Sequence, residues 1–279
     1  MPDAILISTL SLAAAFSWGA ADFSGGFASK KSNVYGVVLV AHAVGLIFTV
    51  AVALLWRDAW PGSQAIWWGF AAGISGGVGL AALYRSLAVG TMGINAPVAS
   101  VVTGLLPVAF TFLTLGLPSR SQLGGFVLAL LAIWLIAMPG GELGRPKGLG
   151  LAVLAGCGFS GFLVCIKLAG TVSKFWPLVS ARVASLLLML VVVAFLRDDW
   201  KPRRGSWRGM VFCGIFDSVG NFLFVYAATR GRLDVAAVLS SLYPASTLIL
   251  ARIFLKERIA KLQAVGIALA LGAVALIAI

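Results

Sequence analysis

Few side chains of this sequence could do chemistry, because ionisable residues are rare inside its long apolar runs. Of the nine acidic residues only Asp22 and Asp217 lie within such runs, and His42 and Arg182 are among the few basic groups there. Placing a charge in hydrocarbon costs about 2.5–3.5 kcal/mol on insertion scales, so a charged group there usually faces protein or water. These four residues are therefore the first candidates for contact with a solute.

The carboxylate of Asp22 has two interpretations. It follows Trp18 by one helical turn, toward the end of its apolar run. There it can bind a substrate ammonium group or carry a coupling proton, with Trp18 beside it. Alternatively it is an interfacial group paired with Lys30 or Lys31.

Four other polar residues lie deeper in their runs. Asp217 and Asn221 are four residues apart, which places them on one face of a helix, and we expect both to face a cavity. Arg182 can hold a carboxylate or backbone carbonyl groups, and His42 has the one side chain whose unperturbed pKa allows a switch near neutrality. For His42 and Arg182 the alternative is a structural hydrogen bond between neighbouring helices.

Aromatic and helix-breaking residues complete the set of candidates. Tyr84 and Tyr226 are either interfacial anchors or cavity residues whose rings stack on a flat substrate. Because proline removes a helical donor, Pro97, Pro107 and Pro244 predict hinges or helix breaks that free backbone carbonyls near a binding site. The alternative is a kink whose carbonyls Ser or Thr satisfies. The substrate-binding candidates in these two segments are Asn95, Ser100, Thr103, Ser240 and Tyr243, with Ser241 in the same stretch.

The elements that must position these residues are transmembrane helices. The chain is 61% hydrophobic and 11% charged, with a mean hydropathy of +1.03, which no soluble core of this size can use. Uncharged runs long enough to cross a bilayer predict an all-α polytopic membrane protein with ten transmembrane helices. We expect these helices at residues 3–28, 34–56, 65–89, 95–116, 122–138, 148–170, 176–196, 207–229, 235–254 and 261–279.

The net charge of +12 does not indicate a nucleic-acid partner. The Lys and Arg residues lie at the ends of the apolar runs, where they face lipid headgroups and orient helices. A lipid bilayer and a small-molecule substrate are the expected partners. No cofactor, metal-ligand or catalytic motif is found in the sequence, which argues against an enzyme.

Two halves of the sequence repeat each other. The segment 122–132 is identical to 263–273 at six of eleven positions, and Pro107 with Pro244, Tyr84 with Tyr226, and His42 with Arg182 follow in the same order. The predicted units are residues 1–141 and 148–279, each with five helices. An odd number of helices inverts the second unit, which is the common architecture for alternating access around a site at the membrane midplane.

These features resemble the drug/metabolite transporter superfamily, specifically its ten-helix EamA-type exporters. The resemblance is carried by Trp18-Gly19, the paired tyrosines and prolines, and the run from Leu255 to Gly266. It is greatest to the bacterial exporters of aromatic and other neutral amino acids, and implies a multi-pass protein of a bacterial-type inner membrane. The first half departs from the pattern, because Leu117 to Gln122 lacks the acidic residue of Lys256-Glu257-Arg258.

The predicted function is export of a small neutral or zwitterionic metabolite, most simply an apolar amino acid, by alternating access. A purine, an organic cation or a sugar is an alternative substrate, and a membrane scaffold that does not transport is an alternative of another class. Gly69, Gly73 and Gly77 permit close helix packing, which we assign to one subunit, so we expect a monomer.

Orientation is left open by two opposing arguments. Loops after odd-numbered spans hold twelve Lys and Arg residues and the other loops five, and positive-inside counting then puts both termini outside. The resemblance implies termini in the cytoplasm.

Overall fold

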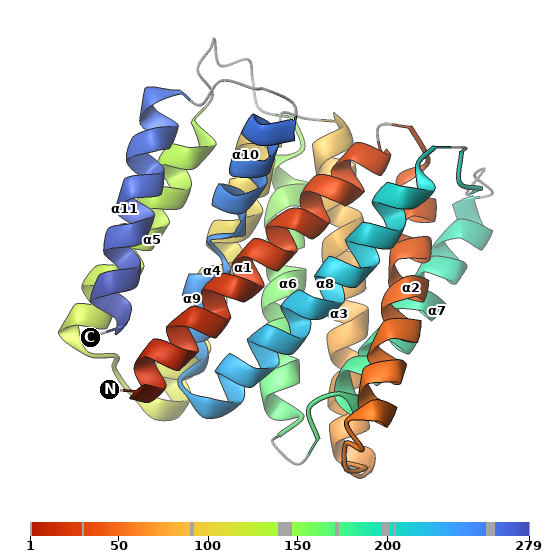
Figure 1. Cartoon of the computed structure of the whole chain (residues 1–279), viewed down its shortest axis with the longest axis horizontal. Coiled ribbons are helices and arrows are strands. Elements are labelled where there is room, and N and C mark those ends of the chain that lie inside the picture. The colour runs from red at the N-terminus through yellow and green to blue at the C-terminus, as the bar shows by residue number, and fades with distance from the viewer. Residues whose placement is uncertain are drawn as a thin grey trace.

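The computed structural model describes residues 2–29, 31–89, 92–138, 147–170, 173–196, 201–203, 205–254 and 260–278, and every regular element among them is an α-helix (Figure 1). The helices are α1 (Pro2–Ser29), α2 (Val34–Leu55), α3 (Ser63–Val89), α4 (Met92–Leu115), α5 (Arg120–Ala137), α6 (Leu149–Leu168), α7 (Trp176–Leu196), α8 (Trp207–Arg230), α9 (Leu233–Ser240), α10 (Tyr243–Phe254) and α11 (Lys261–Ala278). Each helix begins and ends within a few residues of a predicted range, except in the ninth range.

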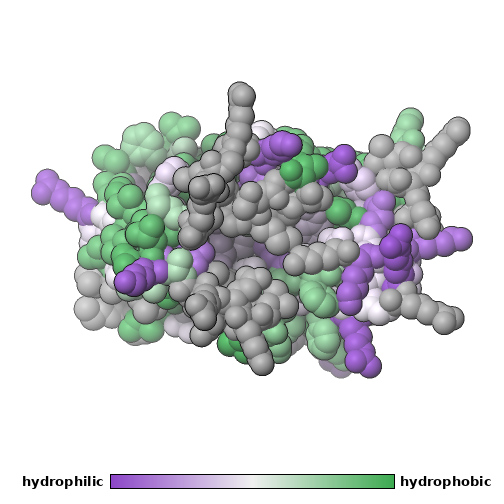
Figure 2. All heavy atoms as spheres, turned by 90° about the horizontal axis from the view of Figure 1, so that it is seen from above, coloured by the Kyte–Doolittle hydropathy of each residue, from purple (hydrophilic) through white to green (hydrophobic). Residues whose placement is uncertain are grey.

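Seven of these helices are long and apolar enough to cross a membrane: α1, α2, α3, α4, α6, α7 and α8. The outer surface fits this environment, since Leu55, Leu113 and Phe195 are more than 80% exposed. Figure 2 looks onto one end of the bundle from above, and the hydrophilic side chains in view gather mainly on its right-hand side and project outward. The prediction of an all-helical, polytopic membrane protein is confirmed at this level.

Helices from the two halves of the chain are interleaved. The helix α1 packs along α8, α3 packs along α6 and α7, and α5 pairs with α11 (Figure 1). The predicted close packing of the glycine stripe is present. A side-chain carbon on Gly69 or Gly73 would collide with the backbone of Pro177 or Ala181 on α7, so these glycines let α3 and α7 approach closely.

Several of these contacts occur twice, once in each half. A side chain on Gly73 would collide with the carbonyl of Ala181, and one on Gly214 with the carbonyl of Ala41. Likewise, a Cβ on Gly79 would lie 2.9 Å from the Phe159 ring, and one on Gly220 2.5 Å from the Trp18 indole. Phe159 follows Trp18 by 141 residues, and Gly220 follows Gly79 by the same number. The two contacts are therefore the same contact, made once with each half supplying the glycine.

The prediction of one continuous helix at residues 235–254 is wrong, because this range contains two helices. The helix α9 ends at Ser240 and α10 begins at Tyr243. Pro244 lacks the N–H that would continue the helical ladder to the Ser240 carbonyl, and the carbonyl of Ser241 accepts a hydrogen bond from Ser100 Oγ on α4. The break expected near Pro244 is therefore present.

The helix α4, in contrast, runs without a break through Pro97 and Pro107, where breaks were also expected. Pro107 leaves the carbonyl of Thr103 without its helical donor. The Ser160 hydroxyl of α6 lies 3.2 Å from that carbonyl, but it also lies 3.0 Å from the Val102 carbonyl and 2.8 Å from the Gly156 carbonyl, so its single proton is shared among three acceptors. The helix thus continues with the freed carbonyl only partly satisfied.

Some predictions fall outside the described residues. These are the ion-pair partner Lys30, residues 142–146 between the two predicted units, and the charged motif Lys256-Glu257-Arg258.

Candidate functional site: a cavity between the two halves

A cavity lies in the middle of the helical bundle, and both halves of the chain line it. Among its lining residues are eight of the predicted substrate-binding side chains: Trp18, Asp22, His42, Thr103, Arg182, Asp217, Asn221 and Tyr243. These residues are far apart in the sequence and come from α1, α2, α4, α7, α8 and α10. The structure therefore brings together most of the polar residues that interrupt the apolar runs.

A chain of polar contacts crosses the cavity wall from α7 to α1. The Arg182 guanidinium forms an ion pair with the Asp217 carboxylate and donates to Ser218 Oγ at 3.3 Å. Asn221 Nδ2 donates to Asp217 Oδ2 at 3.4 Å, and Trp18 Nε1 donates to Asn221 Oδ1 at 3.1 Å. The Arg182 and Asp217 side chains are 9% and 25% exposed, so Asp217 is the more accessible partner.

The space for the Arg182 guanidinium comes from a glycine on α2. A Cβ on Gly45 would lie 3.1 Å from Arg182 Nε and 2.8 Å from Ser218 Oγ. On the same pair of helices, His42 Nδ1 and Ser185 Oγ form a hydrogen bond of 2.5 Å, whose donor depends on the histidine tautomer. His42 thus has the interhelical partner of its structural interpretation and also lines the cavity.

Asp22 and Tyr243 differ from the other polar residues of the cavity. Within the described part of the chain, the Asp22 carboxylate has no hydrogen bond or ion pair. Lys31 is not its partner there, because Lys31 Nζ lies 4.9 Å from the centre of the Phe27 ring. Among the described residues, the Tyr243 hydroxyl also makes no hydrogen bond of good geometry, although its side chain is only 5% exposed and the Ser100 hydroxyl is near enough to interact with it.

The remaining predicted site residues lie elsewhere and make structural contacts. Tyr84 is buried, with its hydroxyl 3.6 Å from Cys213 Sγ. Asn95 Nδ2 donates to the carbonyls of Ser86 and Lys147 at 3.0 Å. Ser100 and Ser240 donate to carbonyls at and beside the α9–α10 break.

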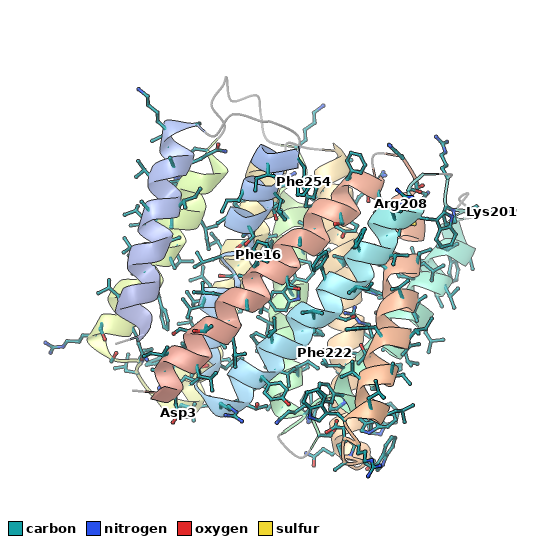
Figure 3. The ribbon with its side chains drawn as sticks, viewed as in Figure 1. Asp3, Phe16, Lys201, Arg208, Phe222 and Phe254 are labelled. Atoms are coloured by element: carbon teal, nitrogen blue, oxygen red, sulfur yellow. The ribbon has the colours of Figure 1, made fainter. Side chains whose placement is uncertain are left out.

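Tyr226 belongs to a cluster of aromatic rings at one end of the bundle. Lys174 Nζ lies 4.1 Å from the centre of its ring, and Phe175 packs against both Tyr226 and Phe222. In Figure 3, Phe222 points to the end of the molecule opposite to Lys201 and Arg208. Tyr226 is thus placed among closely packed rings and a lysine of the α6–α7 connection.

Sequence reasoning missed the apolar wall of the cavity. Gly76 and Leu80 of α3, and Phe159, Phe162 and Leu163 of α6, all line it. Apolar residues carry no individual signal in a chain that is 61% hydrophobic. The alignment of the two repeats could have revealed this wall, because it pairs Phe159 with the predicted site residue Trp18. Among the described residues, no group of three His, Cys, Asp or Glu side chains is placed to hold a metal ion.

Known proteins were compared with this chain at the level of family, sequence and fold. Residues 146–279 match the EamA-like transporter family. The EamA-like family is one of membrane transporters, and its match covers α6 to α11 and therefore Arg182, Asp217 and Asn221. Transport of a small molecule, and not enzymatic turnover, is the activity to which this match points.

Two known proteins are similar to this chain in sequence or in fold. An uncharacterized protein of Methanocaldococcus jannaschii is 26% identical over 133 residues, which make up 47% of this chain and 93% of that protein. A solved crystal structure aligns with a TM-score of 0.78, over 97% of this chain and 95% of the other, at 17% sequence identity. The latter shows that the fold of the whole chain is shared with a known structure.

Proposed function

We propose that this protein carries a small neutral or zwitterionic solute across a membrane by alternating access, with apolar amino acids as the best substrate candidates. The observation that carries the proposal is the cavity in the middle of the bundle, where polar groups of both halves meet an apolar wall. A midplane site between repeated units is the usual position for the solute of a carrier.

The architecture we propose is ten membrane crossings in two inverted repeats, with α9 and α10 together forming the ninth. The contacts that occur twice support it, because Gly79 with Phe159 and Gly220 with Trp18 are reciprocal partners across the two halves. The Methanocaldococcus jannaschii relative also supports it, since 133 residues account for nearly all of that protein. Five crossings per repeat would invert the second unit relative to the first.

For a zwitterionic substrate, each charged end has a candidate partner. The Asp22 carboxylate, unpaired among the described residues, offers an acceptor for an ammonium group, and Tyr243 of the same cavity lining has a hydroxyl that is buried in this conformation. Arg182 offers bidentate donors for a carboxylate, provided that the substrate displaces Asp217 from it. The resemblance to amino-acid exporters supplies the remaining expectation, efflux through a bacterial-type inner membrane by a single subunit.

An organic cation is the second candidate. Asp22 and Asp217 are two carboxyl groups against the one guanidinium of Arg182 in the described lining, so the cavity would have an excess negative charge when both are ionised and His42 is neutral. A monocation would balance that charge on its own, whereas a zwitterion would need a proton or another cation in addition.

Transport can be tested with purified protein in liposomes. We expect saturable uptake of labelled phenylalanine, tryptophan and methionine, competed by other neutral amino acids, and its response to an imposed pH gradient would reveal proton coupling. Uptake of a cation with no uptake of amino acids would favour the second candidate. Flux equal to that of empty liposomes for amino acids, purines, sugars and cations alike would refute a transport function and leave the membrane scaffold.

A further inference from the structure

The two sides of the cavity have opposite chemistry. On one side, α1 and α8 contribute Trp18, Asp22, Asp217 and Asn221. On the other side, α3 and α6 contribute Gly76, Leu80, Phe159 and Leu163. The first set has two carboxylates, an amide and an indole N–H, whereas the second has no hydrogen-bonding side chain.

These two sets occupy the same positions of the repeat. The contacts that occur twice fix the register at 141 residues for α1 with α6 and for this part of α3 with α8. At that register Trp18 corresponds to Phe159 and Asp22 to Leu163. Asp217 likewise corresponds to Gly76, and Asn221 to Leu80. All eight residues line the cavity. The backbone positions of the site are therefore duplicated, but the side chains are polar on α1 and α8 and apolar on α3 and α6.

From this division we infer a subsite for the apolar group of the solute, formed by α3 and α6 and opposite the polar groups of α1 and α8. The inference rests on the proposed transport function and specifies how the solute lies in its site. The polar end of the solute faces Asp22 and Asp217, and its hydrocarbon or aromatic part faces Phe159 and Leu80. An amphipathic solute then has one favoured orientation, because the reverse leaves carboxylates against hydrocarbon.

Gly76 sets the size of this subsite. The nearest atoms to a Cβ at Gly76 belong to the Phe162 side chain, at 3.2–3.5 Å, and both residues line the cavity. Gly73, three residues earlier, packs directly on the backbone of Ala181, and Gly77 faces Ser185 and Leu188. A methyl group at Gly76 would therefore narrow the subsite by pressing on a cavity-lining ring that can shift, whereas Gly73 packs against backbone and cannot accept a methyl group.

The test is to reduce that space by one methyl group. For the Gly76→Ala variant, we expect tryptophan and phenylalanine to lose binding and transport by roughly 10-fold relative to alanine and valine, since one methylene in an apolar pocket has an effect of this order. Binding is measured by calorimetry on detergent-solubilised protein, and flux in liposomes. The control is Gly150→Ala on α6, whose added Cβ would have no atom within 4 Å, and it should leave the selectivity unchanged.

A second variant changes the subsite in the opposite sense. Leu80→Ala enlarges it opposite Asn221, and we expect the preference to move toward tryptophan. Elution as a single species on size exclusion would verify that each variant folds.

The outcomes separate the subsite from the function. The subsite would be overturned, with transport intact, if the wild-type protein transports but Gly76→Ala loses flux equally for every amino acid. No change in selectivity in either variant would overturn it as well. If the wild type neither binds nor transports any member of the panel, the subsite fails together with the proposed function.

Discussion

At the scale of single residues, the contact between Arg182 and Asp217 is the most consequential in the cavity. Arg182 is nearly buried and its charge is balanced by one carboxylate. Removing one partner of a buried ion pair leaves an uncompensated charge, which costs about 3–5 kcal/mol, whereas removing both costs far less.

We therefore predict that Asp217→Asn and Arg182→Gln each lower the stability by about 3 kcal/mol, and that the double variant is more stable than either. Thermal unfolding of the wild type, the two single variants and the double variant in one detergent measures the coupling free energy between Arg182 and Asp217. Additive losses in the double variant would show that the two side chains do not depend on each other.

Asp22 should behave in the opposite way, because its carboxylate has no partner within the described residues. Asp22→Asn replaces a buried carboxyl group that no described residue pairs with, so we expect stability to stay the same or rise. Uptake of amine-bearing solutes should fall at least 10-fold, an estimate from the loss of a charge-assisted hydrogen bond of about 1.5–3 kcal/mol. Liposome flux measures the second effect, and undiminished flux in this variant would exclude Asp22 from the site.

Two tyrosines provide a matched comparison, since each loses one hydroxyl on substitution by phenylalanine. Tyr243 lines the cavity and its buried hydroxyl makes no hydrogen bond of good geometry to a described residue, whereas the Tyr84 hydroxyl contacts a cysteine sulfur and Tyr84 is not among the lining residues. We predict that Tyr243→Phe weakens substrate binding about 5-fold, equivalent to one hydrogen bond of about 1 kcal/mol, and that Tyr84→Phe leaves it unchanged. Calorimetry on both variants would decide, and a larger effect from Tyr84→Phe would reverse the assignment.

At the scale of elements, the break between α9 and α10 distinguishes two segments that the sequence makes alike. Both contain proline, but α4 stays continuous, with the Ser160 hydroxyl of α6 near its freed carbonyl, whereas the α9–α10 segment opens beside the cavity residues Ser241 and Tyr243. The broken segment is therefore the better hinge.

This difference predicts unequal effects of removing the two prolines. Pro244→Ala restores a helical donor and favours a continuous helix, so we expect slower transport with unchanged or higher thermal stability. Pro107→Ala should change the rate little. Transport rates and unfolding temperatures of the two variants test this, and equal slowing by both would remove the distinction between the segments.

The helices and the polar residues of the cavity could be predicted from the sequence for a physical reason. Charge clusters and turns end apolar runs, so helix bounds followed from composition, and a lone Asp217 or Arg182 within a run must have a reason to be there. Sequence reasoning failed where several residues decide together, because α4 continues through two prolines while the α9–α10 segment breaks beside one. The apolar wall at Gly76 and Phe159 became visible only from the register of the repeat in three dimensions.

At the scale of the whole molecule, basic residues mark one end of the bundle. The start of α1 and the end of α11 lie at one end in Figure 1, and Lys201 and Arg208 lie at the other in Figure 3. Positive-inside counting places the basic end in the cytoplasm.

We accordingly predict that a cysteine replacing Arg57 reacts with a membrane-impermeant thiol reagent added to intact cells, while one replacing Lys31 is protected. Both positions are exposed in the structure. The background needs Cys157, Cys165 and Cys213 replaced first. The reverse labelling pattern would place both termini in the cytoplasm.

The interleaving of the helices also sets the order in which this protein can mature. During synthesis α1 enters the membrane while most of the chain is still untranslated, and the face of α1 that carries Trp18 has its partner on α8. Until residues 207–230 have been inserted, that face must be shielded by lipid or by the insertion machinery. A premature stop before α8 would therefore leave α1 without the helix it packs along, a substrate for membrane quality control rather than a smaller working protein.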